Sequence, residues 1–282
     1  MPFSFFLMPV FLFALSQAGS IHWPTTIVAF VILHLLIFPS SNGYNSYQDR
    51  DETSIGGLKH PPRVTINLFY ATLFMDIVAV LLSLVVSVYF SLFALTLALL
   101  SRAYSYRNVR LKKYAVIGFL TVFIFQGAFV FMMASSAINA FSFSNFFTLN
   151  NIICMCVASF FMGSIYPLTQ IYQHDADKKD GVISISYKLG YRGTFLFSAL
   201  LFSIATMFLY YYFNLKHQQL ALVLFLFIML PVVAKLSIWF NKVRKDTVNA
   251  NFENTMNMNL LTSTCMNLYF FVLILNNYYT WF

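Results

Sequence analysis

The chain has 282 residues, 60% of them hydrophobic, and a mean hydropathy of +0.73. A soluble domain of this length cannot bury so much apolar surface, so the composition excludes the soluble classes and indicates a protein surrounded by lipid. The formal net charge of +8 would suggest nucleic acid in a soluble protein. Here it fits basic loops beside a membrane, and we expect no nucleic-acid partner.

Apolar stretches recur along the whole chain, and a transmembrane helix needs roughly 20 such residues. The stretch 64–101 would be about 57 Å long as one helix, too long for a bilayer, so we divide it near Val85–Phe90. The predicted spans are 4–20, 21–40, the two halves of 64–101, 114–134, 149–172, 193–213, 218–240 and 260–280. The predicted fold class is therefore all-α, a polytopic membrane bundle of nine helices that forms one domain over 1–282.

The distribution of Lys and Arg supports this arrangement. Four loops that the nine spans place on one side hold fifteen of the seventeen Lys and Arg residues: 41–63, 102–113, 173–192 and 241–259. Because basic loops stay in the cytoplasm, we expect these four loops and the N-terminus there. The prediction is an integral, multi-pass membrane protein, in the inner membrane if the cell is bacterial, with its functional loops on the cytoplasmic side.

The acidic residues are also clustered. Two clusters follow the second and sixth spans: Asp49, Asp51 and Glu52, then Asp175, Asp177 and Asp180. Clustered carboxylates repel one another, and a hard cation such as Mg²⁺ relieves that repulsion while it bridges to substrate phosphates. One such loop would favour simple solvation of its charges, but two loops on one face favour a shared site.

The first acidic segment reads NSYQDRDET, from Asn45 to Thr53. It resembles the first aspartate-rich motif of the UbiA superfamily of intramembrane prenyltransferases, and four of its residues are in register with that motif: Asn45, Tyr47, Asp49 and Arg50. The third acidic position of the family is Thr53 here, and Asp51 and Glu52 beside it are candidates to substitute. The Arg-Pro pair that usually follows resembles His60–Pro61, with Lys59 adjacent.

A second motif and a basic loop extend the resemblance over essentially the whole chain. In DKKDGVIS, Asp177 occupies the final acidic position, but the carboxylates expected seven and four residues earlier are Gln170 and Gln173, for which Asp175 partly compensates. The stretch YSYRNVRLK is similar to a loop of the chlorophyll-synthase-like members and matches it at Tyr104, Ser105, Arg110 and Lys112.

This resemblance implies a nine-helix fold that moves an isoprenyl group from an allylic diphosphate to a lipophilic, often aromatic, acceptor within the membrane. It implies Mg²⁺ as the cofactor, which neutralises the leaving diphosphate. The implied metal ligands are Asn45, Asp49 and Asp177, with Asp51 and Asp175 as second choices. The implied catalytic residues are Asp49, Asp177, Arg110 and Lys112. Further substrate contacts are expected from Asn45, Tyr47, Arg50, Lys59, Tyr104 and Lys178.

Two alternative functions and the role of Asp76 stay open. Because Gln offers an oxygen but no charge, Gln170 and Gln173 favour weaker metal binding, and a catalytically impaired lipid-binding or scaffold protein is possible. A small-molecule transporter is another class, although the spans hold few ionisable residues and show no clear repeat. Asp76 within the third span either orients an acceptor hydroxyl or is protonated and bonded to a neighbouring helix.

Overall fold

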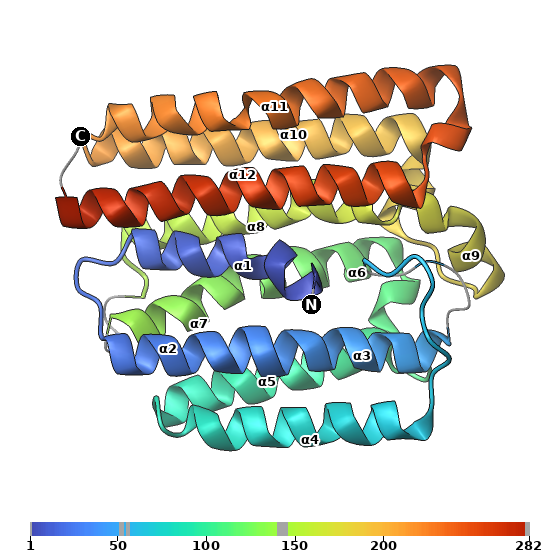
Figure 1. The fold of residues 1–282 in the computed structure, drawn as a ribbon, viewed down its shortest axis with the longest axis horizontal. Coiled ribbons are helices and arrows are strands. Elements are labelled where there is room, and N and C mark those ends of the chain that lie inside the picture. The colour runs from blue at the N-terminus through green and yellow to red at the C-terminus, as the bar shows by residue number, and fades with distance from the viewer. Residues whose placement is uncertain (1, 51–53, 55–56, 140–145, 280–282) are drawn as a thin grey trace.

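The computed structural model describes residues 2–50, 54, 57–139 and 146–279, and the elements formed by these residues are all helical. The helices run side by side along the long axis of the molecule (Figure 1). In chain order they are α1 (Pro2–Ser16), α2 (Trp23–Val31), η1 (Ile32–Ile37), α3 (Phe38–Asp49), α4 (Ile66–Ser83), α5 (Val88–Ser105), η2 (Leu111–Lys113), α6 (Ala115–Val122), η3 (Phe123–Ala128), α7 (Phe129–Ile138), α8 (Leu149–Thr169), η5 (Ile171–Gln173), α9 (His174–Lys179), α10 (Ile185–Leu215), α11 (Gln219–Lys245), η6 (Thr247–Asn249) and α12 (Phe252–Tyr279).

Within the described ranges, eight helical runs are long and apolar enough to cross a membrane, and a shorter apolar helix covers Ser4–Ser16. Together they are consistent with the predicted nine-helix bundle, and the chain is an all-α, multi-pass membrane protein. The long stretch 64–101 breaks where predicted, between the end of α4 at Ser83 and the start of α5 at Val88. Ser87 caps α5, because its hydroxyl accepts a 3.0 Å hydrogen bond from the backbone N–H of Phe90.

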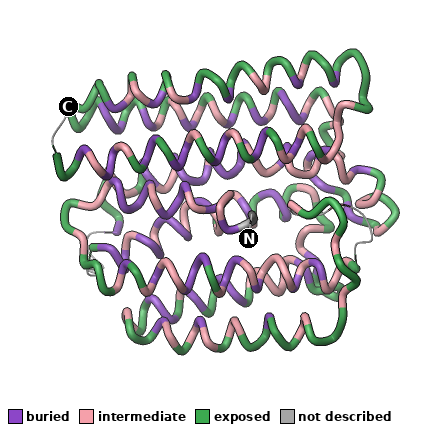
Figure 2. Tube along the Cα trace, in the orientation of Figure 1, coloured by how far each residue is buried: buried purple, intermediate pink, exposed green. Residues whose placement is uncertain are grey.

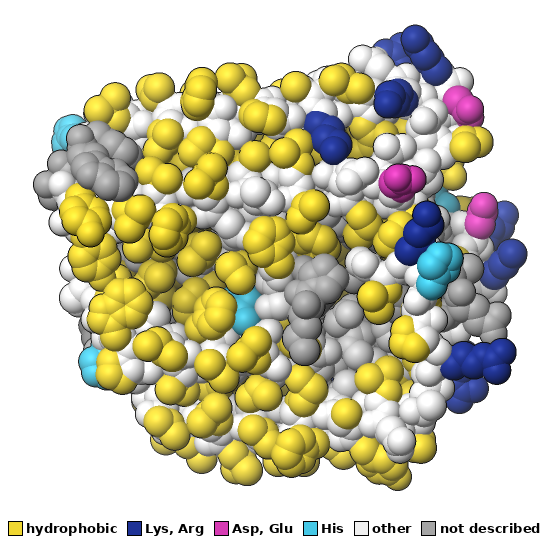
Figure 3. Space-filling model, viewed as in Figure 1, with side chains coloured by type: hydrophobic (Ala, Val, Ile, Leu, Met, Phe, Trp, Pro, Cys, Tyr) yellow, Lys and Arg dark blue, Asp and Glu magenta, His cyan; other side chains and the backbone are white. Residues whose placement is uncertain are grey.

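Apolar side chains cover most of the face seen in Figure 3, and most of the charged side chains gather at the end where α9 lies in Figure 1. Burial separates central from peripheral helices (Figure 2). In the most apolar part of α4, 17% of the residues are buried, against 61% in the most apolar part of the run Leu149–Lys179. The α4 helix therefore faces lipid, whereas α8 lies at the centre of the bundle.

The second span is longer than predicted, since the helical run of α2, η1 and α3 continues past residue 40 to Asp49. Polar residues can extend this helix because α5 supplies partners for them. The Ser101 hydroxyl donates to Ser41 at 2.5 Å, and the Ser105 hydroxyl donates to Asn45 at 2.9 Å. Arg50 ends the helix in a left-handed conformation, with φ 53° and ψ 39°.

The functional end of the bundle follows from helix packing. The α3 helix packs against α4 and α5, and α8 packs against α10 and η3. The last turns of α3 and α5, the short η2 helix and α9 therefore meet at one end of the molecule (Figure 1). Asp49, Lys112, Asp175 and Asp177 belong to these elements, and Arg110 and Asp180 directly adjoin η2 and α9.

Candidate active site

A cavity of ≈ 280 Å³ lies between the helices at this end of the bundle. Its lining joins three segments that are far apart in the sequence: the first acidic segment on α3, the basic loop after α5, and the second acidic segment around α9. The predicted site residues that line it are Asn45, Asp49, Tyr104, Arg110, Lys112 and Asp177. The fold thus brings together the two acidic segments and the cations between them in sequence.

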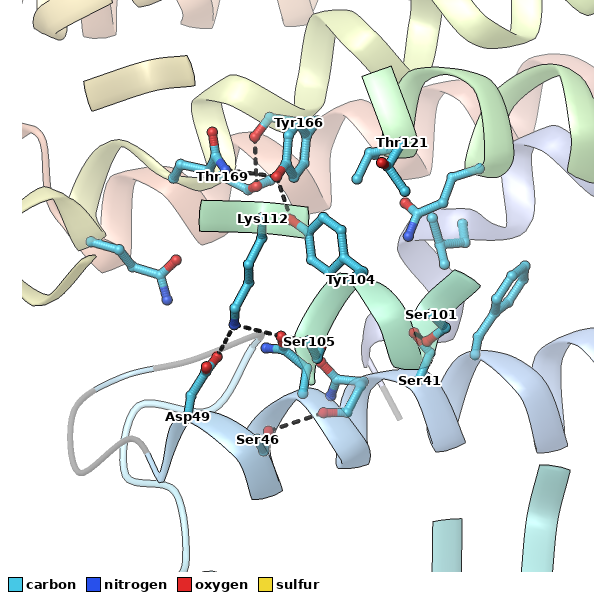
Figure 4. A pocket seen from close by; sticks show the side chains of 18 of the residues that line it. Ser41, Ser46, Asp49, Ser101, Tyr104, Ser105, Lys112, Thr121, Tyr166 and Thr169 are labelled. Atoms are coloured by element: carbon cyan, nitrogen blue, oxygen red, sulfur yellow. Dashed lines mark hydrogen bonds and ion pairs between the residues drawn. The ribbon is translucent and has the colours of Figure 1, made fainter. Parts of the chain in front are cut away.

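Asn45 and Asp49 lie four residues apart on α3, so their side chains project from the same face of the helix. The Lys112 ammonium group contacts both residues, as Figure 4 shows for Asp49. It donates to Asn45 Oδ1 at 2.8 Å and forms an ion pair with Asp49 Oδ2. Ser105 also donates to Asn45 Oδ1, at 2.9 Å. These bonds hold the Lys112 ammonium group at the wall of the cavity.

Arg110 connects the first acidic segment to the second. Its backbone is left-handed, with φ 45° and ψ 61°, a conformation that costs free energy in a residue other than glycine. The buried guanidinium donates to Asp49 Oδ1 at 3.1 Å, to the Asp180 backbone oxygen at 3.1 Å, and forms an ion pair with the Asp180 carboxylate. Its Nε is buried and finds no hydrogen-bond partner in the described part of the chain.

Charge pairing dominates the electrostatics of this contact. Burial alone would lower the pKa of the Arg110 guanidinium, but hydrogen bonds and charges from Asp180 and Asp49 raise it above its ordinary value. Burial likewise raises the pKa of Asp180, but the bond to Arg110 outweighs it, and the net pKa lies below the ordinary range. Both groups are therefore charged at neutral pH, and each neutralises the other.

Two tyrosines and two glutamines form the wall on the α8 side. The Tyr104 and Tyr166 hydroxyls are hydrogen-bonded to each other (Figure 4), and the Gln170 amide donates to the Tyr166 hydroxyl at 2.8 Å. The carbonyl oxygen of Gln170 is buried and has no hydrogen-bond partner among the described residues. Gln173 also lines the cavity. The two positions where carboxylates were expected are thus part of the cavity wall but carry no charge.

Some predicted contacts lie away from the cavity. The Tyr47 ring lies beside the Phe69 ring of α4, with 5.5 Å between centroids. Four further described residues are also outside the lining: Arg50, Lys59, Asp175 and Lys178. The second-choice metal ligand Asp51, together with Glu52 and Thr53, lies outside the described residues.

Asp76 belongs to a separate polar cluster between α3, α4 and α5. It accepts hydrogen bonds from Arg102 Nε at 2.9 Å and from an Arg102 terminal nitrogen at 2.5 Å. The Arg102 guanidinium lies 4.0 Å from the centre of the Tyr44 ring, a cation–π distance. None of these three residues lines the cavity. The carboxylate of Asp76 therefore joins neighbouring helices and does not reach an acceptor in the cavity.

The sequence of residues 6–261 matches the model of the UbiA prenyltransferase family. The chain belongs to this family. The match covers nearly the whole described structure and includes all the residues of the basic loop and both acidic segments. No curated protein matches the sequence at a significant level.

Solved structures share the UbiA fold with this chain. A UbiA homolog from Archaeoglobus fulgidus bound to DMAPP and Mg²⁺ has a TM-score of 0.66 at 15% identity, with 97% of this chain and 96% of that chain covered. The apo UbiA homolog from Aeropyrum pernix K1 has a TM-score of 0.67 at 16% identity, with 96% and 97% covered. A digeranylgeranylglyceryl phosphate synthase has a TM-score of 0.60 at 18% identity, with 98% and 93% covered. At these identities the likeness establishes the fold.

The UbiA metal can be tested against the donors in this cavity. Among the described residues, no group of three His, Cys, Asp or Glu side chains is placed to hold a metal ion. Both oxygens of Asp49 already contact cations, from Arg110 and Lys112. Since Mg²⁺ keeps several waters and binds through one or two carboxylates plus substrate phosphates, the cavity fits an ion held jointly with a diphosphate. Asp49, Asp177 and Asn45 carry the oxygens that would hold it, and Asp49 and Asn45 would have to release contacts with Lys112 and Arg110 to do so.

Asp180 and Gln126 line the cavity but were not among the predicted site residues. Asp180 lies three residues after Asp177 at the end of α9, and that spacing places both on one helical face, so the sequence could have indicated it. Gln126 also lines the cavity, from the π-helical segment η3. Helical periodicity gives no signal for it, because a π-helical turn changes the register of the residues that follow.

Proposed function

We propose that this UbiA family member transfers an isoprenyl group from an allylic diphosphate to a lipophilic acceptor within the membrane, with Mg²⁺ as its cofactor. The observation that supports this most is that Asp49, Arg110, Lys112 and Asp177 line one cavity. The solved UbiA homolog from Archaeoglobus fulgidus binds DMAPP with Mg²⁺ and GPP with Mg²⁺, which supports an isoprenoid diphosphate as the substrate class here.

In the proposed reaction, the bond between the allylic carbon and the diphosphate oxygen breaks, and the diphosphate leaves with the electron pair. The acceptor forms the new bond to that carbon and releases a proton to water or to the diphosphate. Lys112 and Arg110 hold the departing diphosphate, since preorganised cations stabilise charge that develops in the transition state. Asn45 keeps Lys112 in place through their 2.8 Å hydrogen bond. A bound Mg²⁺ would supply further neutralisation of the leaving group.

The allylic carbocation needs a surface that stabilises it and excludes water. The Tyr104 ring belongs to the cavity wall, and its hydroxyl is fixed by Tyr166. We propose that the aromatic face of Tyr104 stabilises the cation, because the face of an aromatic ring attracts positive charge. Tyr47, the other aromatic candidate, lies beside Phe69 and is not assigned this role.

We also propose that the cavity opens toward the cytoplasm and that residues 1–282 act as one domain. The end of the bundle that holds the cavity also holds most of the charged side chains on the visible face (Figure 3). Fifteen of the seventeen Lys and Arg residues belong to loops predicted on this side, in agreement with a cytoplasmic position.

One observation favours a second candidate function, a catalytically impaired member that binds an isoprenoid diphosphate without cleaving it. Gln170 and Gln173 line the cavity at the two positions expected to hold carboxylates. With fewer charges the cavity attracts metal ions less strongly, and the leaving group would then be less completely neutralised. This candidate predicts binding of the diphosphate without its release.

One experiment separates the two candidates. The purified chain in lipid nanodiscs is incubated with GPP and an acceptor panel, and diphosphate release is measured with Mg²⁺, with EDTA, and after Mg²⁺ is returned. The proposed function predicts release that EDTA stops and Mg²⁺ restores. Binding of GPP without release under any of these conditions would establish the impaired candidate instead.

A further inference from the structure

The cavity has two chemically different ends. Its charged lining residues all belong to the two acidic segments and the basic loop: Asp49, Arg110, Lys112, Asp177 and Asp180. A second group of lining residues is polar but neutral: Ser41, Asn42, Ser101, Thr121, Gln126 and Asn259. We call this second group the neutral end.

The neutral end lies deeper in the bundle than the charged end. Ser41 precedes Asp49 by eight residues on the helical run, which corresponds to about 12 Å along the axis. Figure 4 shows Ser41, Ser101 and Thr121 on the side of the pocket away from Asp49 and Lys112. The hydroxyls of Ser41 and Ser101 are 2.5 Å apart and hydrogen-bonded, so they join α3 to α5 at this depth.

An unusual backbone segment places Gln126 in the wall of the neutral end. Gln126 lies in the π-helical segment η3, and such segments occur frequently at functional sites. Contacts with α8 fix this segment: a Cβ on Gly127 would lie 2.4 Å from the Cα of Ser159, and the Ser159 hydroxyl accepts a 3.0 Å hydrogen bond from the Ala128 N–H. The sequence therefore permits a close approach here that a larger residue would prevent.

Two amide side chains of the neutral end can serve a bound molecule. In the described part of the chain, no hydrogen bond engages the Gln126 amide, which can both donate and accept. Asn259 on α12 also lines the cavity and is 5% exposed. A ligand in the cavity would provide hydrogen-bonding partners for both amides.

We propose that the neutral end binds the acceptor and that the head group of this acceptor is a neutral hydroxyl or carbonyl, as in a phenol or quinol. A carboxylate or phosphate placed there would be buried without a cation, which costs several kcal/mol per ion. Arg110 and Lys112, the cations of the described lining, are paired with Asp180 and Asp49 at the charged end. This proposal rests on the proposed function, because Arg110 and Lys112 are reserved there for the diphosphate.

The test uses matched acceptors with the full-length chain in nanodiscs. Initial rates are measured with GPP and Mg²⁺ for a quinol and for the same ring that bears a carboxylate. We expect kcat/KM to favour the neutral acceptor by about 100-fold or more, since an unpaired anion would have to be buried. GPP affinity is measured in parallel with a non-cleavable thiolodiphosphate analogue.

Variants of Gln126 then test the residue itself. Gln126→Leu should raise KM for the quinol by about tenfold, because it removes one or two hydrogen bonds to the acceptor. It should leave the affinity for the diphosphate analogue unchanged. Gln126→Lys should improve use of the carboxylate acceptor relative to wild type. Ile124→Leu, an exposed position on the same segment, is the matched control and should change neither constant.

The outcomes distinguish failure of the neutral-acceptor proposal from failure of the proposed prenyl transfer. Turnover that favours the carboxylate acceptor, or an unchanged quinol KM in Gln126→Leu, would overturn the neutral acceptor and leave prenyl transfer standing. If the chain neither binds the thiolodiphosphate analogue nor prenylates any acceptor, the proposed function fails and this inference fails with it.

Discussion

The two acidic segments meet in one cavity but differ in how their carboxylates are paired and in which motif positions keep a carboxylate. On α3, Asp49 contacts Arg110 and Lys112 with its two carboxylate oxygens. On the opposite side, Gln170 and Gln173 leave Asp177 as the only carboxylate among the three motif positions of the second segment. We propose that Arg110 and Lys112 neutralise much of the diphosphate charge and that the two Gln residues weaken metal binding by the second segment.

Loss of the Asp49 charge should have the largest effect. Asp49→Asn leaves Arg110 and Lys112 without their shared partner and removes a proposed metal ligand, so we predict that kcat falls by about 10²–10³. Turnover of GPP with Mg²⁺ measures it. Thr53→Ala and Asp175→Asn should change turnover little, since Thr53 has no charge to lose and Asp175 does not line the cavity. Intact turnover in Asp49→Asn would mean that the first acidic segment is misassigned.

Lys112 offers a sharper comparison with its neighbour. Lys112→Gln removes a cation of the cavity wall and should raise KM for GPP by about tenfold to a hundredfold, because hydrogen bonds to charged groups contribute about 1.5–3 kcal/mol. Lys113 is exposed and lies outside the lining, so Lys113→Gln is the matched control. Equal changes in both variants would show that only the overall positive charge of the loop matters.

A carboxylate restored to the second segment should strengthen its metal binding. In Gln173→Glu, we predict that the Mg²⁺ concentration for half-maximal turnover falls by about threefold to tenfold, since the number of charged ligands tunes metal affinity. Gln218→Glu, beyond the far end of α10, is the control. An unchanged or higher Mg²⁺ requirement in Gln173→Glu would argue against metal binding on this side.

The Asp76–Arg102 pair should affect stability and have the smallest effect on turnover. Asp76→Asn leaves the Arg102 charge between the helices without its carboxylate. We expect the free energy of unfolding to fall by about 1.5–3 kcal/mol, with little change in kcat. Thermal unfolding in detergent measures the stability, and turnover at low temperature measures kcat. Glu253→Gln, an exposed carboxylate, is the control. A large loss of turnover at full stability would assign Asp76 to the reaction.

The sequence predicted the helical architecture well, because apolar stretches separated by charged loops determine where spans begin and end. It also predicted that Asp49, Arg110, Lys112 and Asp177 belong together, and the cavity includes all four. Tyr47 was less predictable. Two residues from both Asn45 and Asp49, it points about 200° around the helix from each and meets Phe69, a difference that helical periodicity could have indicated.

Other features depend on three-dimensional contacts that a single sequence does not reveal. The helical continuation to Asp49 requires partners on α5 for Ser41 and Asn45. The pairing of Asp76 with Arg102 joins positions on neighbouring helices. Gln126 lies in a π-helical segment whose Gly127 closely approaches Ser159 on α8. Each depends on side chains from distant segments that local patterns do not link.

The most direct test of the proposed function is an electron cryo-microscopy structure of the full chain in nanodiscs with a geranyl thiolodiphosphate and Mg²⁺. We predict diphosphate density in the cavity between Asp49 and Asp177, in contact with Arg110 and Lys112, and an isoprenyl chain that extends from it among the helices. Density for the analogue elsewhere, with Arg110 and Lys112 still paired to Asp180 and Asp49 and no anion beside them, would contradict it.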